Sequence, residues 1–124
     1  VAELIKAAGA KSVIMDEREH DCCAAYMSHV PHVAAAALVN ILAVAPCQDS
    51  LLKLMGGGFR DTTRIASSDA DMWADICLTN PEAIAQGLKQ FRQTVEQVIH
   101  SIENGNRTQL HAFFSASKER RNSM

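Results

Sequence analysis

Two closely spaced histidines stand out among the residues of this sequence that could do chemistry. His29 and His32 lie in the run SHVPH at residues 28–32, and the pair His20-Asp21 precedes them. Imidazoles donate and accept hydrogen bonds and change charge near neutral pH. On a helix, residues three apart point about 60° from one another, so His29 and His32 would share one side. That side carries Ala, Ser, His and Asn rather than Lys and Glu, which indicates burial against a polar ligand, a partner or another domain. Two interior histidines beside a helix kink would give the same pattern.

A glycine-arginine run forms a second candidate, at residues 56–64 (GGGFRDTTR). Arg60 and Arg64 are four residues apart and could share a helical face, and Asp61 could orient one of them. Arginine is suited to bidentate recognition of a carboxylate. The run is not a phosphate-binding P-loop, because no Lys-Ser/Thr follows the glycines. A glycine hinge with surface arginines is the alternative.

Trp73, the only tryptophan, is the third candidate, as a ligand wall or as core filling. Two kinds of site compete for these residues. His20-Asp21 with His29 and His32 could form a metal site of the type found in HD phosphohydrolases, although the order of these residues is unfavourable. The other kind is a carboxylate-binding site with histidines beside it and arginines above it, and the lack of an acidic cluster favours it.

The hydrophobic spacing predicts that helices position these residues. A helix is expected over 17–44 with a kink or a new start at Pro31, and a long one begins at Asn80-Pro81. A short helix closed by Gly9 and a strand at 11–15 form a βα remnant in front. We expect an all-α domain of about five helices behind that remnant. The other predicted helices cover 49–55 with Asp49 as N-cap, 60–66, 70–79 with Asp69 as N-cap, and a last one capped by Asn106 that passes Phe113 and Phe114 and frays in the polar tail.

The composition is that of one globular domain: 124 residues, 48% hydrophobic, 21% charged, and a net charge of −2. This charge argues against nucleic acid or an anionic membrane as partner. We see no apolar run long enough to span a bilayer. The four cysteines, Cys22, Cys23, Cys47 and Cys77, form no Cys-x-x-Cys pair, and we expect them reduced in the cytoplasm.

Taken together, the motifs resemble the prephenate/arogenate dehydrogenase family of tyrosine biosynthesis. The resemblance covers nearly the whole chain. The matching residues, which occur in the family's order, are His20-Asp21, residues 28–32, residues 56–66, Met72-Trp73, Asp75-Ile76 and Asn80.

The resemblance implies a two-domain enzyme. An N-terminal Rossmann domain would bind NAD or NADP, and a helical C-terminal domain would complete the substrate site and form the homodimer. Residues 1–16 would be the tail of the nucleotide-binding domain and 17–124 the helical domain. No Gly-x-Gly-x-x-Gly occurs here, and the family's catalytic histidine has no counterpart, so we expect no catalytic residue in this fragment and no activity from it alone.

The resemblance also implies roles for individual residues. Arg64 would hold a carboxylate of prephenate or arogenate, and His29 and His32 would line the pocket as hydrogen-bond donors. A dimerisation module without a ligand and a His/Asp metal-dependent hydrolase stay open as alternatives. The supporting residues would be Arg60 and Asp61, either beside the pocket or on the side of the dimer partner, Trp73 as a wall or gate, and Gly57 and Gly58 in a loop that closes over the substrate.

Overall fold

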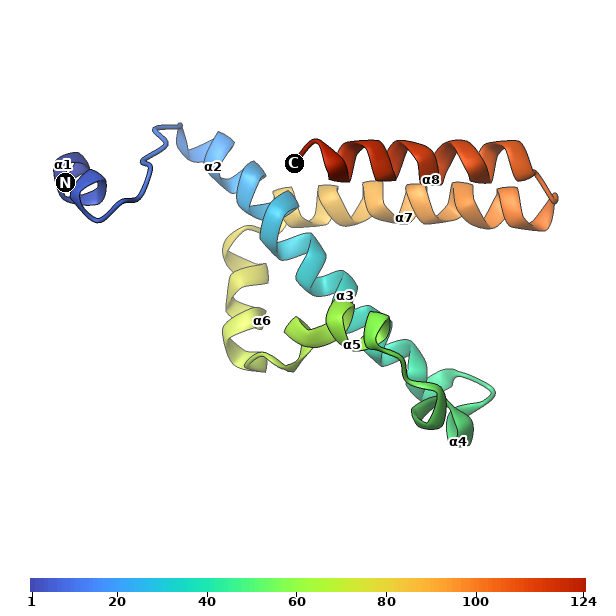
Figure 1. Ribbon diagram of the computed structural model, residues 1–124. Helices are drawn as coiled ribbons and strands as arrows, with labels where there is room; N and C mark the ends of the chain where they lie inside the picture. Colours follow the sequence, from blue (N-terminus) through green and yellow to red (C-terminus); the bar gives the residue numbers. More distant parts are fainter. The chain divides into compact units, whose positions relative to one another are not determined.

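The computed structural model describes residues 1–124, apart from the side chains of Ala2 and Asp49. In the described chain every regular element is a helix, so the predicted all-α domain is confirmed (Figure 1). Two compact units divide it, Val1–Ile84 and Ala85–Met124, and each is described by itself.

The first helix, α1 (Ala2–Ala7), ends before Gly9, whose φ of +76° is the left-handed geometry expected of a closing glycine. The strand predicted at 11–15 is wrong, because residues 10–16 have no regular structure. A strand needs a neighbour to complete its hydrogen bonds, and the described chain supplies none. Val13 and Ile14 are exposed accordingly.

A long helical segment follows (Figure 1), and a π-helical turn changes its hydrogen-bond pattern near the middle. Asp16 caps its start by accepting a hydrogen bond from the Glu19 N–H at 2.9 Å. Pro31 lies in the first turn of the new helix, so the predicted restart there is confirmed. The segment consists of α2 (Glu17–Ala24), a π-helical turn (Ala25–His29), α3 (Val30–Asn40) and a 3-10 turn (Ile41–Val44).

The segment Glu17–Val44 is long and apolar enough to cross a membrane by length and composition. The expectation that no apolar run reaches this length is therefore wrong, because residues 22–44 contain no Lys, Arg, Asp or Glu. Only 11% of its most apolar window is buried in the single chain. Its apolar side chains therefore need a cover that this chain does not provide.

The glycine run opens a helix instead of forming a loop. Gly56 is the N-cap of α5 (Gly57–Thr63), and a 3-10 turn (Arg64–Ser67) continues it. The preceding helical segment ends at Leu54, before the glycines, and each glycine of the run has an ordinary negative φ, which the first turn of a helix accepts. The preceding α4 (Gln48–Leu51) has Cys47 as its N-cap, so the predicted N-cap at Asp49 is wrong.

The next helices begin where predicted. Asp69 caps α6 (Ala70–Thr79) by accepting from the Met72 N–H at 2.8 Å. Pro81 is the first residue of α7 (Pro81–Glu103), where its missing N–H costs nothing.

The chain turns at Gly105, whose φ is +60°, and Asn106 caps α8 (Arg107–Asn122) through the Gln109 N–H at 3.1 Å. Figure 1 shows α7 and α8 side by side and antiparallel. The predicted fraying of the tail is wrong, because α8 stays helical through Asn122. Arg120 and Arg121 lie in the last turn, where positive charge favours the helix dipole.

Both units bury little on their own. In Val1–Ile84, α3 packs against α5 and the Arg64–Ser67 turn, and the buried apolar residues are Ala25, Ala35 and Ile84. In the α7–α8 hairpin, large apolar side chains stay 40–63% exposed: Phe91, Val95, Ile99, Ile102 and Phe114.

Candidate functional site

The imidazole of His32 stacks on the indole of Trp73. Their ring centroids are 3.4 Å apart and their planes differ by 13°. His29 meets the same indole edge-on, with centroids 6.1 Å apart and planes at 79°. The histidines come from the π turn and α3, and the tryptophan comes from α6. The fold thus brings together three of the residues singled out by the sequence.

Polar ring atoms of this cluster are buried. Only 8% of His32 is exposed, and this desolvation lowers the pKa of its imidazole from the ordinary 6.5, so the neutral ring is favoured. His29 Nδ1 and Trp73 Nε1 are buried and find no hydrogen-bond partner among the described residues. A buried donor without an acceptor is unfavourable, so the indole N–H has unused capacity for a water or ligand atom.

A hydrogen bond forms a second contact between the α6 region and the same long helical segment. The side-chain amide of Asn80, at the end of α6, donates a hydrogen bond of 2.8 Å to the backbone carbonyl of Asp21 in α2. Trp73 lies in α6, and Asn80 is the C-cap residue that follows the last residue of this helix. The α6 region therefore touches the long segment on both sides of the π turn.

The charged residues of the glycine-arginine run lie on two elements that pack against α3, the helix that carries His32. Arg64 begins the 3-10 turn that packs on α3, and Arg60 and Asp61 belong to α5. All three are exposed, and none forms an ion pair with another described side chain. Their charges are therefore available to a ligand or a partner.

The two glycines expected in a closing loop lie in the first turn of α5 instead. A Cβ atom built at Gly57 or at Gly58 would meet nothing within 4 Å. In this chain the surface beside them is therefore open.

The His20-Asp21 pair is formed but faces solvent. His20 Nδ1 lies 3.2 Å from Asp21 Oδ1, with the two side chains 69% and 45% exposed. Among the described side chains, no three from His, Cys, Asp and Glu come together as a metal would require. The hydrolase alternative thus gains no support from the geometry.

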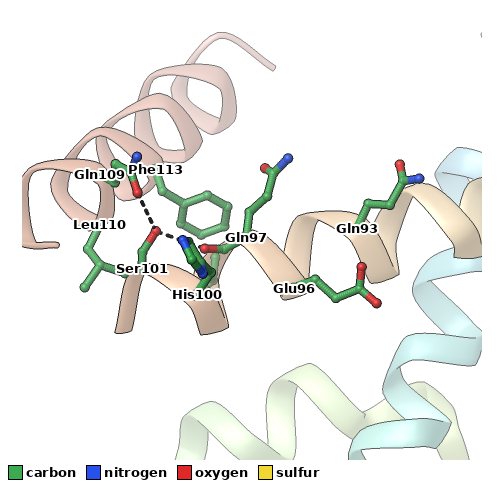
Figure 2. A pocket seen from close by; sticks show the side chains of 9 residues that line it. Gln93, Glu96, Gln97, His100, Ser101, Gln109, Leu110 and Phe113 are labelled. Carbon is green, nitrogen blue, oxygen red and sulfur yellow. Dashed lines mark hydrogen bonds between the residues drawn. The ribbon is translucent and has the colours of Figure 1, made fainter. Parts of the chain in front are cut away.

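A cavity lies between α7 and α8, and none of the predicted site residues lines it (Figure 2). It measures about 590 Å³ and is lined by glutamines and by Phe113. The Ser101 hydroxyl lies between two acceptors there, the Gln97 carbonyl at 2.9 Å and Gln109 Oε1 at 3.0 Å. We consider this cavity a groove between two helices, since an open hairpin leaves such a gap without any ligand.

Sequence reasoning missed three features of the site: the His32–Trp73 stack, the π turn and the Asn80–Asp21 bond. Only the π turn has a signal in the sequence, because Pro31 inside an otherwise regular helical pattern requires some local adjustment. The two contacts join residues that are 41 and 59 positions apart in the chain, and no local pattern reveals such pairs.

Residues 16–116 match the family described as prephenate dehydrogenase, dimerization domain. This match covers most of the chain, and the chain belongs to that family.

Individual relatives of the chain are prephenate or arogenate dehydrogenases, in agreement with the family match. The chain is 35% identical to a prephenate dehydrogenase of Lactococcus lactis, over 98% of this chain and 35% of the relative. Among solved structures, Synechocystis arogenate dehydrogenase has a TM-score of 0.90 at 25% identity, over 98% of this chain and 45% of that one. Prephenate dehydrogenase of Aquifex aeolicus, in complex with hydroxyphenyl propionate and NAD⁺, has a TM-score of 0.86 at 32% identity and is covered to 44%. The chain spans less than half the length of these relatives.

Proposed function

We propose that this chain is the helical C-terminal domain of a prephenate or arogenate dehydrogenase, which catalyses NAD(P)-dependent oxidative decarboxylation in tyrosine biosynthesis. The observation that carries the proposal is the cluster of His29, His32 and Trp73. The element that bears the unpaired Arg64 packs against the helix that carries His32. The family match supports the same assignment.

The substrate chemistry suits these residues. Prephenate carries two carboxylates and a cyclohexadienol ring. The guanidinium of Arg64 would bind one carboxylate through charge-assisted hydrogen bonds, with Arg60 and Asp61 beside it. The imidazoles of His29 and His32 would donate hydrogen bonds, and the indole of Trp73 would form a wall of the pocket. These contacts would hold the ring in place for hydride removal.

The cofactor would be NAD or NADP, whose nicotinamide accepts the hydride when it is bound. The residues described here do not fit a dinucleotide site by themselves. The glycine run opens a helix of seven residues and follows no strand, unlike the turn that cradles a pyrophosphate. We therefore assign cofactor binding to another part of the full-length protein.

The partner would be a second copy of the chain. The hairpin α7–α8 and the long segment Glu17–Val44 both expose apolar side chains that a single chain does not cover. A partner helical domain would cover them, and the family's description as a dimerization domain supports this over a lipid bilayer. With all four cysteines free as thiols, a reducing cytoplasmic location suits the protein.

The test measures NAD(P)H formation from prephenate and from arogenate. We expect turnover by the full-length protein that contains this domain and none by the 124-residue chain. Full-length protein that folds, binds a nicotinamide cofactor and turns over neither substrate would contradict the proposal. A pure dimerisation module would instead show kinetics unchanged by substitution of Arg64.

A further inference from the structure

The long helical segment changes its hydrogen-bond pattern immediately before Pro31. Residues Ala25–His29 form a π-helical turn, and the Val30 N–H donates to the carbonyl of Ala25, five residues back. Proline has no N–H, and its ring collides with the carbonyl four residues back in a regular α-helix. The wider π turn removes this conflict, so Pro31 is the physical reason for the turn.

A π turn acts as one residue inserted into an α-helix. Compared with a regular helix, it shifts the register of α2 against α3 by one residue, which is about 100° of rotation and 1.5 Å of rise. Every contact that involves both α2 and α3 depends on this shift.

The α6 region, including its C-cap Asn80, contacts the long segment both before and after the π turn. Asn80 bonds the Asp21 carbonyl in α2, before the turn, and Trp73 stacks on His32 in α3, after it. Trp73 lies within α6 and Asn80 is the C-cap residue that directly follows its last residue, so one helix and its cap set the spacing of the two contact points. A change of 100° in the long segment cannot satisfy both contacts at once.

We propose that Pro31 is a positioning residue that sets, through the π turn, the register in which α6 holds both Asp21 and His32, and so places Trp73 against the two histidines. The inference rests on the proposed function where it makes this cluster part of a substrate pocket. The positional argument itself uses only contacts within Val1–Ile84. Pro31 is exposed, so its own side chain is not needed to fill a core.

The test is Pro31→Ala in the 124-residue chain, which restores a backbone N–H and permits a regular helix. Two measurements report on the two contacts, one on the His32–Trp73 stack and one on the Asn80–Asp21 hydrogen bond. The first is the pH-dependent quenching of Trp73 fluorescence that His32→Gln removes, because a protonated imidazole against the indole quenches its emission. The second is the loss of stability caused by Asn80→Ala, measured in urea.

We expect Pro31→Ala to abolish at least one readout: either the His32-dependent quenching disappears, or Asn80→Ala no longer destabilises. When Asn80→Ala is added to a Pro31→Ala protein that has lost the quenching, the quenching should return, since α2 is then free to rotate. Retention of both readouts, or quenching that stays lost in the double variant, would overturn the proposal.

Pro81→Ala is the matched control, because Pro81 also occupies a first helical turn but no π turn precedes it. It should keep both readouts. Should Pro31→Ala unfold, Pro31→Gln carries the same N–H and is measured in its place; loss of cooperative folding in both variants would also count against a purely positional role. None of these readouts needs substrate or cofactor, so failure of the dehydrogenase proposal would be seen separately.

Discussion

The imidazole of His32 lies flat on the indole of Trp73, with 3.4 Å between the ring centroids. The stack is almost completely buried on the histidine side, since His32 is 8% exposed. An imidazole in this position loses the water that would stabilise its charge. Its neutral form can still donate one hydrogen bond to a ligand, which is the role proposed for it.

Protonation of His32 should destabilise the fold. The unfolded chain titrates this imidazole near 6.5, and burial lowers the pKa in the folded state. Below 6.5 the unfolded chain therefore binds more protons, and stability rises with pH. The contribution is complete above 6.5 and is lost as the pH falls through the lowered value.

Urea unfolding at several pH values on both sides of 6.5 measures this effect. His32→Gln should reduce the change of the free energy of unfolding with pH. His111→Gln, at an exposed position of α8, should leave this pH dependence unchanged. A steeper loss of stability in His32→Gln at acid pH would mean that cation–π attraction to Trp73 outweighs desolvation.

Substitution of Arg64 should weaken substrate binding in the full-length enzyme and leave the fold intact. A charge-assisted bond to a carboxylate is worth roughly 1.5–3 kcal/mol, so Arg64→Ala should lower kcat/KM by about 10- to 150-fold. Most of this effect should appear in KM. Arg64→Lys should restore part of it, because an ammonium lacks the planar fork.

Arg107→Ala provides the control, as an exposed arginine at the start of α8. Steady-state kinetics that are the same for wild type, Arg64→Ala and Arg107→Ala would remove Arg64 from the site.

Loss of the Asn80–Asp21 bond should destabilise the chain. Asn80→Ala removes a part-buried hydrogen bond of 2.8 Å. The expected cost is about 0.5–1.5 kcal/mol in the free energy of unfolding. Asn122→Ala, at the exposed end of α8, should change it little. Equal effects of the two substitutions would show that the bond contributes nothing specific.

A charge on the apolar side of α7 should disrupt self-association. Ile99→Glu places a carboxylate on a side chain that is 46% exposed in one chain and, in the proposed dimer, covered by the other. Sedimentation at tens of micromolar protein should show a dimer for wild type and a monomer for this variant. Gln86→Glu, exposed on the same helix, is the control and should remain a dimer. A monomeric wild type would contradict the dimer directly.

The sequence predicted the helices well because their limits are encoded locally. Asp69, Pro81, Gly105 and Asn106 act within one turn of their own positions. The strand at 11–15 failed for the opposite reason: β-favouring residues form a strand only when a partner strand is present.

The sequence was enough to select the residues of the candidate site, but it did not predict which of them are in contact. His29, His32 and Trp73 could be selected because histidine and tryptophan are informative residues, but their contact depends on how α6 crosses the long segment. Gly57 and Gly58 illustrate a wrong inference from type alone, since glycine permits a loop and does not require one.

The exposed apolar side chains of the α7–α8 hairpin have a thermodynamic consequence. Two helices that bury little against each other gain most of their stability when a second hairpin associates with them. Under the proposed dimer, folding and assembly are then a single equilibrium governed by mass action. The melting temperature then rises with the concentration of the chain, and dilution without any denaturant shifts the equilibrium toward the dissociated, unfolded chain.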